Sequence, residues 1–304
     1  MLKSNIKLLN IIIALMPSFA YAQKITLGAC ETRDGGAYRG EMQAGKPHGK
    51  GLARYQNGDT YEGQYVKGKR QGHGIYSFSD GEKYDGEWFQ DQQHGHGTYY
   101  FMNNNKYVGL WFRDYQQGHG IMYYYNGDKY EGNWDQDKRS GRGKYTFAGG
   151  AYYDGMWLGD KKNGKGVYVW GDGTTYDGMW KDNMRSGKGT NRYADGDVYV
   201  GEWKNDLQDG KGKLTKKNGD VFDGTFKKGK PDGMVIVHFS DGSKYKGTYK
   251  NGKREGSAIE VTKDGTRFEG TYVNDRRDGK FIEKNRDGQI VKKGRYENGR
   301  RYEE

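Results

Sequence analysis

A 23-residue repeat runs through most of the chain's 304 residues and limits the fold more than any other feature. Aromatic residues recur every 23 positions from Tyr38 to Phe268 without a gap. Glycine stands two residues after each of these rings and a large side chain four residues after, as in Tyr84, Gly86 and Trp88. We therefore expect eleven copies of one supersecondary unit, stacked side by side in an elongated array.

Each unit has the pattern of two β-strands. Residues 83–88 alternate rings or glycine with polar residues, and residues 95–101 keep the same period, which is typical of strands. Asn-Gly or Asp-Gly separates the second strand from the next unit in most copies, and this is the strongest short signal for a hairpin. Asn104 replaces that glycine once. Since asparagine tolerates positive φ better than other non-glycine residues, the exchange predicts a left-handed conformation there.

The length of this loop decides which face each ring takes. A three-residue loop with the glycine as a bulge places Tyr99 opposite Tyr107, and Gly97 opposite Gly109. A two-residue loop shifts the register by one and reverses the side chains. We expect the three-residue loop because it gathers rings and glycines on one face and leaves the polar residues on the other.

The composition is unusual for a folded chain of this length. Leu, Ile, Val and Phe total only 44 residues, about 14%, a range typical of disordered chains. Glycine supplies 52 residues and aromatic residues supply 15%, and the repeat gives both a defined place. A doubly wound sheet, an aliphatic barrel and a helix bundle are excluded. We expect an all-β, open sheet without a central core, with its rings exposed along one face.

The first residues have the layout of a secretory signal peptide. Lys3 and Lys7 precede an apolar stretch at 8–19, and small residues lead up to a cleavage site near Ala22–Gln23. Residues 1–22 are thus expected to be removed, leaving a periplasmic, cell-envelope or extracellular protein. Residues 27–30 resemble a lipoprotein box, but polar residues separate them from the apolar stretch, so we do not expect lipid anchoring at Cys30. A single cysteine also excludes an internal disulfide.

Atypical segments flank the repeats. In residues 23–37, Gly28, Cys30 and Gly35 occupy the positions that Gly51, Ala53 and Gly58 hold in the first full unit, which predicts an N-terminal half-repeat. Eleven repeats then cover residues 38–288. Residues 289–304 form a degenerate unit in which Val291, Gly294 and Tyr296 are shifted by one position. Such ends are typical of caps on a repeat array.

No constellation for catalysis, a cofactor or a metal stands out. The Gly-Lys-Gly segments do not lie between a strand and a helix, as phosphate loops do. His73, His96 and His119 share one slot in consecutive units, about 9–10 Å apart, too far to bind one zinc. His94 and His96 would need a third ligand. We therefore expect no enzymatic activity, no cofactor and no small-molecule substrate.

The motifs resemble those of the MORN repeat, which is known from junctophilins, phosphatidylinositol-phosphate kinases and radial-spoke head proteins. The residues that carry the resemblance are Tyr-Glu-Gly-Gln-Tyr at 61–65, Gly-Lys-Arg-Gln-Gly-His-Gly at 68–74 and Tyr-Asp-Gly-Glu-Trp at 84–88. The resemblance covers Tyr38 to Gly288. It implies an elongated, open, twisted antiparallel sheet of stacked hairpins with a groove along one face, and, for some families, contact with lipids.

Two functions are compatible with these features. The first is a scaffold that binds a protein, a peptide or a second copy of the chain through sheet edges or groove aromatics, for which the candidates are Trp88, Trp111, Trp134, Trp157, Trp180 and Trp203. The alternative is attachment to an anionic membrane or envelope polysaccharide, because residues 206–304 hold 24 basic and 17 acidic residues. The candidate contacts there are Lys211, Lys213, Lys216, Lys217, Lys227, Lys228, Lys230, Lys292 and Lys293. Nucleic acid is not an expected partner of an exported chain.

Overall fold

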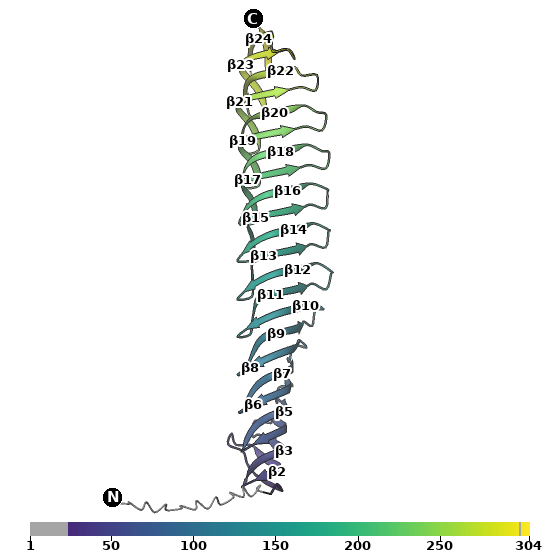
Figure 1. Cartoon of the computed structure of the whole chain (residues 1–304), viewed down its shortest axis with the longest axis vertical. Helices are drawn as coiled ribbons and strands as arrows, with labels where there is room; N and C mark the ends of the chain where they lie inside the picture. The colour runs from purple at the N-terminus through teal and green to yellow at the C-terminus, as the bar shows by residue number, and fades with distance from the viewer. Residues whose placement is uncertain (1–23, 298) are drawn as a thin grey trace, which may run out of the picture.

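The structure, a computed structural model, describes residues 24–297 and 299–304 and arranges them in one antiparallel sheet of 25 strands. Each strand pairs with the strands before and after it in the sequence. The strands form the rungs of a long rod whose two ends hold the first and the last strands (Figure 1). The predicted all-β, open sheet of stacked hairpins is confirmed. Within the described ranges, no helix is long and apolar enough to cross a membrane.

The strands alternate between short and long members, one of each per repeat. They are β1 (Thr26–Glu31), β2 (Ala37–Gln43), β3 (Lys46–Arg54), β4 (Thr60–Val66), β5 (Lys69–Ser77), β6 (Lys83–Phe89), β7 (Gln92–Tyr100), β8 (Lys106–Phe112), β9 (Tyr115–Tyr123), β10 (Lys129–Asp135), β11 (Lys138–Thr146), β12 (Tyr152–Leu158), β13 (Lys161–Val169), β14 (Thr175–Lys181), β15 (Met184–Arg192), β16 (Val198–Lys204), β17 (Leu207–Thr215), β18 (Val221–Lys227), β19 (Lys230–His238), β20 (Lys244–Lys250), β21 (Lys253–Val261), β22 (Arg267–Val273), β23 (Arg276–Lys284), β24 (Ile290–Glu297) and β25 (Arg300–Glu303).

The predicted turn and register between units are both confirmed. After β7, the backbone N–H of Asn104 donates to the carbonyl of Phe101, and Asn104 adopts a φ of 62°. This three-residue loop places Tyr99 opposite Tyr107, and its equivalents do the same along the rod. The other turn of each unit is shorter, as between β6 and β7, where Gln90 and Asp91 both have positive φ. Two-residue turns of this kind match the right-handed twist of the flanking strands.

A β-bulge inside each unit bends the hairpin, and the sequence analysis did not predict it. Between β10 and β11, Gly132 pairs with Gly143 and Trp134 pairs with Arg139. Only residue 133 separates these pairs on β10, whereas residues 140–142 separate them on β11. Gly141 supports the bulge with a φ of 65°. Because bulges bend a strand and increase its twist, the open sheet folds partly over one of its own faces.

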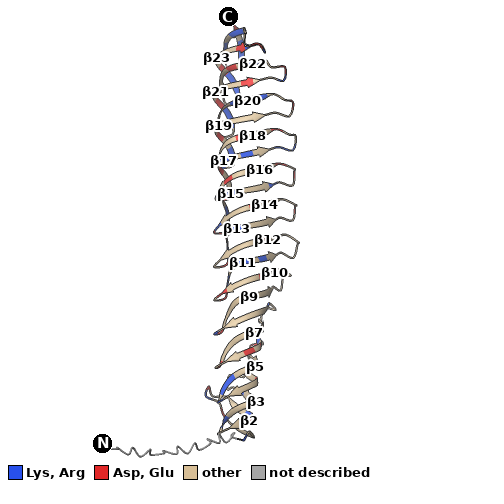
Figure 2. Ribbon diagram, in the orientation of Figure 1, with Lys and Arg blue, Asp and Glu red and all other residues tan. Residues whose placement is uncertain are grey.

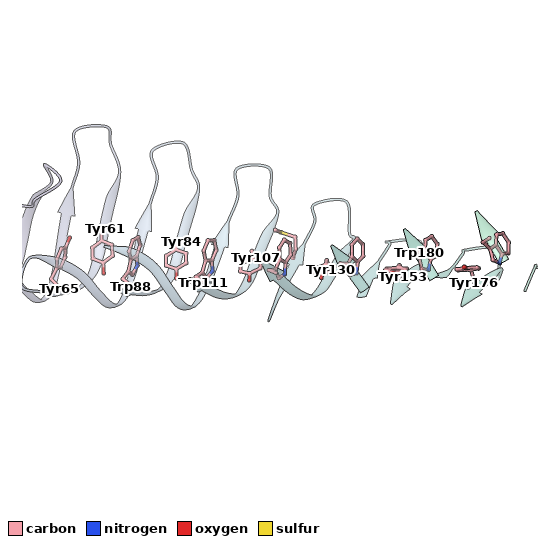
Figure 3. Packing of buried hydrophobic residues seen from close by; sticks show 14 of the residues in the cluster. Tyr61, Tyr65, Tyr84, Trp88, Tyr107, Trp111, Tyr130, Tyr153, Tyr176 and Trp180 are labelled. Carbon is pink, nitrogen blue, oxygen red and sulfur yellow. The ribbon is translucent and has the colours of Figure 1, made fainter. Parts of the chain in front are cut away.

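That bend encloses a column of aromatic rings, so the rod has a core. Tyr130 packs edge-on against Trp134 of its own unit at 5.1 Å and against Trp157 of the next unit at 5.4 Å. The same zigzag continues from Tyr38 to Phe226. Figure 3 shows part of it, from Tyr61 to Trp180, in the bend between the upright hairpin arms and the lower ribbon. Our expectation of a sheet without a core is therefore wrong. The bulges create an interior, and aromatic residues fill it in place of aliphatic ones.

Glycine pairs give the tyrosine rings their room. The ring of Tyr130 lies over Gly132 and Gly143, and its hydroxyl donates to the carbonyl of Asn133 at 3.0 Å. A Cβ on Gly132 would meet the backbone of Gly143 and lie 2.6 Å from the Tyr130 hydroxyl oxygen. Any side chain at this pair would therefore displace a ring that is wholly buried.

The sheet continues past the repeats at both ends. In β1, Cys30 lies opposite Tyr38 and Gly28 lies opposite Gly40. At the other end the strand pairing skips Val291, which absorbs the predicted one-residue shift. The signal peptide predicted at 1–22 lies outside the described residues. Near the C-terminus Val235 replaces a paired glycine, and there the aromatic column gives way to a second buried cluster.

Candidate binding face

The six tryptophans predicted to line an open groove lie inside the aromatic core instead. Trp88, Trp111, Trp134, Trp157, Trp180 and Trp203 are only 4–6% exposed. Their indole N–H groups are also used internally, as in Trp157, which donates to the carbonyl of Gly143 at 2.9 Å. The expectation that these rings are exposed is wrong because the bulge bends each hairpin around them. They form the floor of the concave face.

A different row of rings is accessible on that face. In the first seven units, the residue seventeen positions after the repeat-initiating ring is aromatic, and all seven of these rings are half-buried. We call this row the aromatic rim; it consists of Tyr55, Phe78, Phe101, Tyr124, Phe147, Trp170 and Tyr193. Phe147, for example, packs against Tyr145 with ring centroids 4.8 Å apart. Its 23-residue period was visible in the sequence, but only the bend of the hairpins shows that these rings stay partly accessible while the six core tryptophans are buried.

Cationic side chains lie on the floor in most units. We call the residue nine positions after each repeat-initiating ring the stacking position. Arg70, Arg139, Lys162 and Arg185 at this position lie over the tryptophan of the next unit. Arg139 holds its Cζ 4.4 Å from the ring centroid of Trp157, and Arg185 is 4.2 Å from that of Trp203. Along the array the position is occupied by Pro47, Arg70, Gln93, Gln116, Arg139, Lys162, Arg185, Gln208, Pro231, Arg254 and Arg277. Such cation–π contacts stabilise by about 0.5–2 kcal/mol, depending on desolvation.

A carboxylate of the next unit holds four of the five stacking arginines in place, whereas Arg277 pairs with Glu260 of the preceding unit. The backbone N–H and the Nε of Arg139 both donate to Asp160 Oδ1, at 3.1 and 2.9 Å. Asp206 accepts the same two donors from Arg185. The carboxylate, which we call the clamp, stands seven residues after the ring of its own unit. Each pair therefore joins two neighbouring repeats through hydrogen bonds and an ion pair.

Lys162 is the one lysine at a stacking position, and in the next unit an amide, Asn183, replaces the clamp carboxylate. Its backbone N–H donates to Asn183 Oδ1 at 2.8 Å, and its Nζ lies 4.3 Å from the ring centroid of Trp180. Burial lowers the pKa of Lys162 to about 8, with Asp206 partly opposing the shift. The charged state of this side chain is thus only weakly preferred at neutral pH.

Two neighbouring units break the cation row. Gln93 and Gln116 are buried at the stacking position, and their backbone N–H groups donate to the clamps Asp114 and Asp137 at 2.7 Å. A cavity of about 610 Å³ opens over these units. Its lining includes Phe101 and Tyr124 of the rim, the rings of Trp111 and Trp134, and the clamps Asp114, Asp137 and Asp160.

The lysines predicted to contact an anionic surface are exposed but lie on several surfaces. Figure 2 shows basic and acidic segments interspersed along the C-terminal part of the rod. Lys211 and Lys213 lie on the outer face, Lys216 and Lys217 at one edge, and Lys227, Lys228 and Lys230 around the turn at the other edge. Lys216 pairs with Asp197, and Lys292 and Lys293 lie 3.7 and 3.9 Å from Glu303 and Glu304. The positive charge is therefore divided among several surfaces and partly paired.

The remaining candidate groups take ordinary positions. His73, His96 and His119 are exposed on the outer face, where His73 lies 3.1 Å from Asp85. Among residues 24–297 and 299–304, no group of three or more metal-ligating side chains is close enough to hold an ion. Cys30 is a free thiol whose pKa is raised by burial.

Comparison with known proteins gives one strong match. The model of the MORN repeat matches eleven consecutive segments, at 38–60, 61–83, 84–106, 107–129, 130–152, 153–175, 176–198, 199–221, 222–244, 245–267 and 268–280. No curated protein matches the chain significantly.

Similar solved structures include the TCP10 domain of Danio rerio CPAP in complex with a peptide of Danio rerio STIL, at 14% identity and a TM-score of 0.32, covering 89% of this chain and 100% of that one. Another is the SAS-4 (dCPAP) TCP domain of Drosophila melanogaster in complex with a proline-rich motif of Ana2 (dSTIL), at 15% identity and a TM-score of 0.32, covering 51% of this chain and 85% of that one. At such scores the likeness carries no argument about this chain.

Proposed function

This chain belongs to the MORN repeat family, whose members are generally scaffolds that bind proteins or membranes, and on that premise we propose that it is a non-catalytic, exported scaffold for a protein or peptide partner. The partner lies along the concave face, on the aromatic rim. Export rests on the predicted signal peptide and is part of the proposal.

The observation that carries the proposal is the rim itself. Seven half-buried rings lie in consecutive units beside the buried tyrosine and tryptophan rings of the core. Aromatic residues are enriched at protein interfaces because they bury a large apolar area and lose little conformational freedom on binding. A row of them on a preorganised surface supports binding to an extended segment. The continuous row ends at Tyr193, because Lys216 takes the position in the next unit and Phe239 stands alone beyond it, so we assign the proposed surface to the first seven repeats.

Capture from the native compartment with paired variants tests the proposal. Phe101→Ala combined with Tyr124→Ala removes two neighbouring rim rings, and we expect it to reduce recovery of the partner at least tenfold. Phe112→Ala combined with Tyr123→Ala removes two rings that are 47% and 39% exposed outside the rim, and it serves as the matched control. Equal recovery by both double variants would contradict the proposal. Mass spectrometry of the exported chain tests for a mature N-terminus near Gln23.

Attachment to an anionic surface is the second candidate. The observation in its favour is that all nine predicted lysines are exposed. Their distribution over several surfaces predicts weak, salt-sensitive contact, since exposed charges are screened over about 8–10 Å at ordinary ionic strength.

A further inference from the structure

The cavity over Gln93 and Gln116 has the chemistry of a receptor for arginine side chains. We propose that it binds an extended segment of the partner whose arginines occupy the two stacking positions that this chain does not fill itself. This inference rests on the proposed scaffold function and specifies where and how the partner is recognised.

The first argument is the shape of the side chain at the stacking position. In Arg139 the guanidinium carbon lies 4.4 Å from the ring centroid of Trp157 and 5.5 Å from that of Tyr145. Glutamine lacks the atoms that correspond to Cζ and the two Nη groups of arginine. Gln93 and Gln116 therefore leave Trp111 and Trp134 without the planar cation that covers the equivalent rings elsewhere, and the cavity lies at these units.

The second argument is charge. The clamps of the arginine units are ion-paired, as in Arg139–Asp160 at 2.9 Å and Arg185–Asp206 at 3.2 Å. Asp114 and Asp137 accept a backbone N–H, but no lysine or arginine of the described chain lies within ion-pair distance of either one. Arg139 also lines the cavity, but it is paired with Asp160, so Asp114 and Asp137 are the two lining carboxylates without an ion-pair partner among the described residues. They lie beside rings whose faces attract cations.

The array itself indicates that the cation is arginine. Wherever a stacking cation meets an aspartate clamp, the cation is arginine: Arg70 with Asp91, Arg139 with Asp160, Arg185 with Asp206 and Arg254 with Asp275. The lysine at this position meets Asn183 instead. The planar guanidinium can stack on an aromatic ring and donate to a carboxylate at the same time, which an ammonium group does less well.

A third residue that differs from its equivalents in the neighbouring units, Met122, lines the same cavity. Met122 stands where the neighbouring units have Tyr99 and Tyr145. Methionine is unbranched and adapts to its neighbours, so the wall at this point can adjust to a ligand. Two adjacent units thus carry three residues, Gln93, Gln116 and Met122, where the flanking units at 61–83 and 130–152 have arginine and tyrosine, and all three line one cavity.

Spacing defines the form of the ligand. Equivalent positions in adjacent units are separated by two strands, about 9–10 Å. A polyproline II segment repeats every three residues and rises about 3.1 Å per residue, so its residues i and i+3 point to the same side about 9 Å apart. The two sites therefore suit arginines at positions i and i+3 of a segment that runs along the rod in this extended conformation. Phe101 and Tyr124 would contact the residues between them.

Titration of the full chain with synthetic peptides tests this inference. The probe is a fluorescently labelled twelve-residue peptide with arginine at every third position and serine or glycine elsewhere, followed by fluorescence anisotropy. We expect saturable binding, and at least tenfold weaker binding of the same peptide with lysine in place of arginine.

Two double variants locate the site, and the array supplies a precedent for each. Gln93→Arg with Gln116→Arg fills the cavity with the chain's own cations, as Arg70 and Arg139 do in their units, and we expect binding to fall at least tenfold. Asp114→Asn with Asp137→Asn keeps the backbone hydrogen bond that Asn183 makes and is expected to weaken binding similarly. Circular dichroism checks that both variants remain folded.

Gln208→Arg is the matched control. Gln208 is buried at the same position, but the next unit has Gly229 in place of a clamp, and it does not line the cavity. This variant should bind the peptide as the unaltered chain does. Absence of peptide binding, equal affinity for the lysine peptide, or equal binding by all variants would overturn the inference. Capture of the native partner by the Gln93→Arg/Gln116→Arg variant would also overturn it, while leaving the scaffold function intact.

Discussion

The glycine pair beneath each tyrosine is the feature on which the stability of the rod depends most directly. Three glycine-to-alanine substitutions within the repeat at 130–152 separate a clash with the backbone, a clash with the tyrosine ring and the loss of glycine alone. A Cβ at Gly132 would lie 2.6 Å from the Tyr130 hydroxyl oxygen, 2.8 Å from the Arg142 carbonyl oxygen and closer still to the backbone of Gly143. The three atoms nearest to a Cβ at Gly143 all belong to Tyr130: two ring carbons at 2.5 and 2.7 Å and the hydroxyl oxygen, which is closer still. A Cβ at Gly149, in the loop, has no neighbour within 4 Å.

These contacts predict an order of destabilisation. Gly132→Ala forces two paired strands apart and should cost at least about 3 kcal/mol, at the upper end of overpacking effects. Gly143→Ala only tilts Tyr130 and should cost about 1–3 kcal/mol, including part of a hydrogen bond worth about 1 kcal/mol. Ala258 occupies this position naturally, and there the hydroxyl of Tyr245 reaches its carbonyl acceptor at a longer 3.3 Å. Gly149→Ala should be neutral or stabilising by up to about 1 kcal/mol, through the unfolded state.

Urea denaturation followed by tryptophan fluorescence measures the series, and hydrogen exchange of residues 130–147 shows whether the loss is local. A repeat array can unfold in segments, so the comparison rests on the order of the midpoints rather than on a two-state free energy. Equal midpoints for Gly132→Ala and Gly149→Ala would refute the account of how the tyrosine rings are packed.

Three further predictions concern charge and pH. Burial raises the pKa of Tyr38 and Tyr176 to about 12, against about 10 when unfolded, so the folded state holds protons that the unfolded state releases. Stability should therefore fall between pH 10 and 12 together with the appearance of phenolate absorbance, and a constant urea midpoint over that range would contradict this. Lys162 has the opposite sign: with a folded pKa of about 8 and an unfolded value of about 10.4, its contribution to stability rises with pH in that window. Lys162→Met should remove the rise, and Asn183→Asp should raise the pKa of the lysine, as measured by NMR of its Nζ. Finally, if the basic third attaches to anionic vesicles, glutamine at Lys227, Lys228 and Lys230 should reduce low-salt co-sedimentation severalfold, whereas glutamine at Lys46, Lys67 and Lys69 should not; equal sedimentation would exclude that surface.

The sequence correctly predicted the structural features that depend on residues close together in the chain. It did not predict the features that depend on the bend of each hairpin at its β-bulge. The opposition of Tyr99 and Tyr107 follows from strand period and turn chemistry, so it was predicted correctly. The burial of Trp157 was not, because it depends on a bulge that needs Gly141 in a left-handed conformation. The contact of Arg139 with Trp157 joins two units across the sheet, and no local pattern reveals it.

The same arrangement explains why a binding site in this fold should coincide with a local loss of stabilising contacts. Arg70, Arg139, Arg185 and Arg254 each give their unit a cation–π contact and an ion pair with the next unit, as Arg139 does with Trp157 and Asp160. At Gln93 and Gln116 the chain forgoes both contacts, while the backbone hydrogen bonds to the clamps keep the strands in place. An arginine from a partner would supply the missing contacts and join neighbouring units at the same time. Binding at this cavity should then stiffen the repeats around it, since a ligand that binds only the folded state stabilises that state.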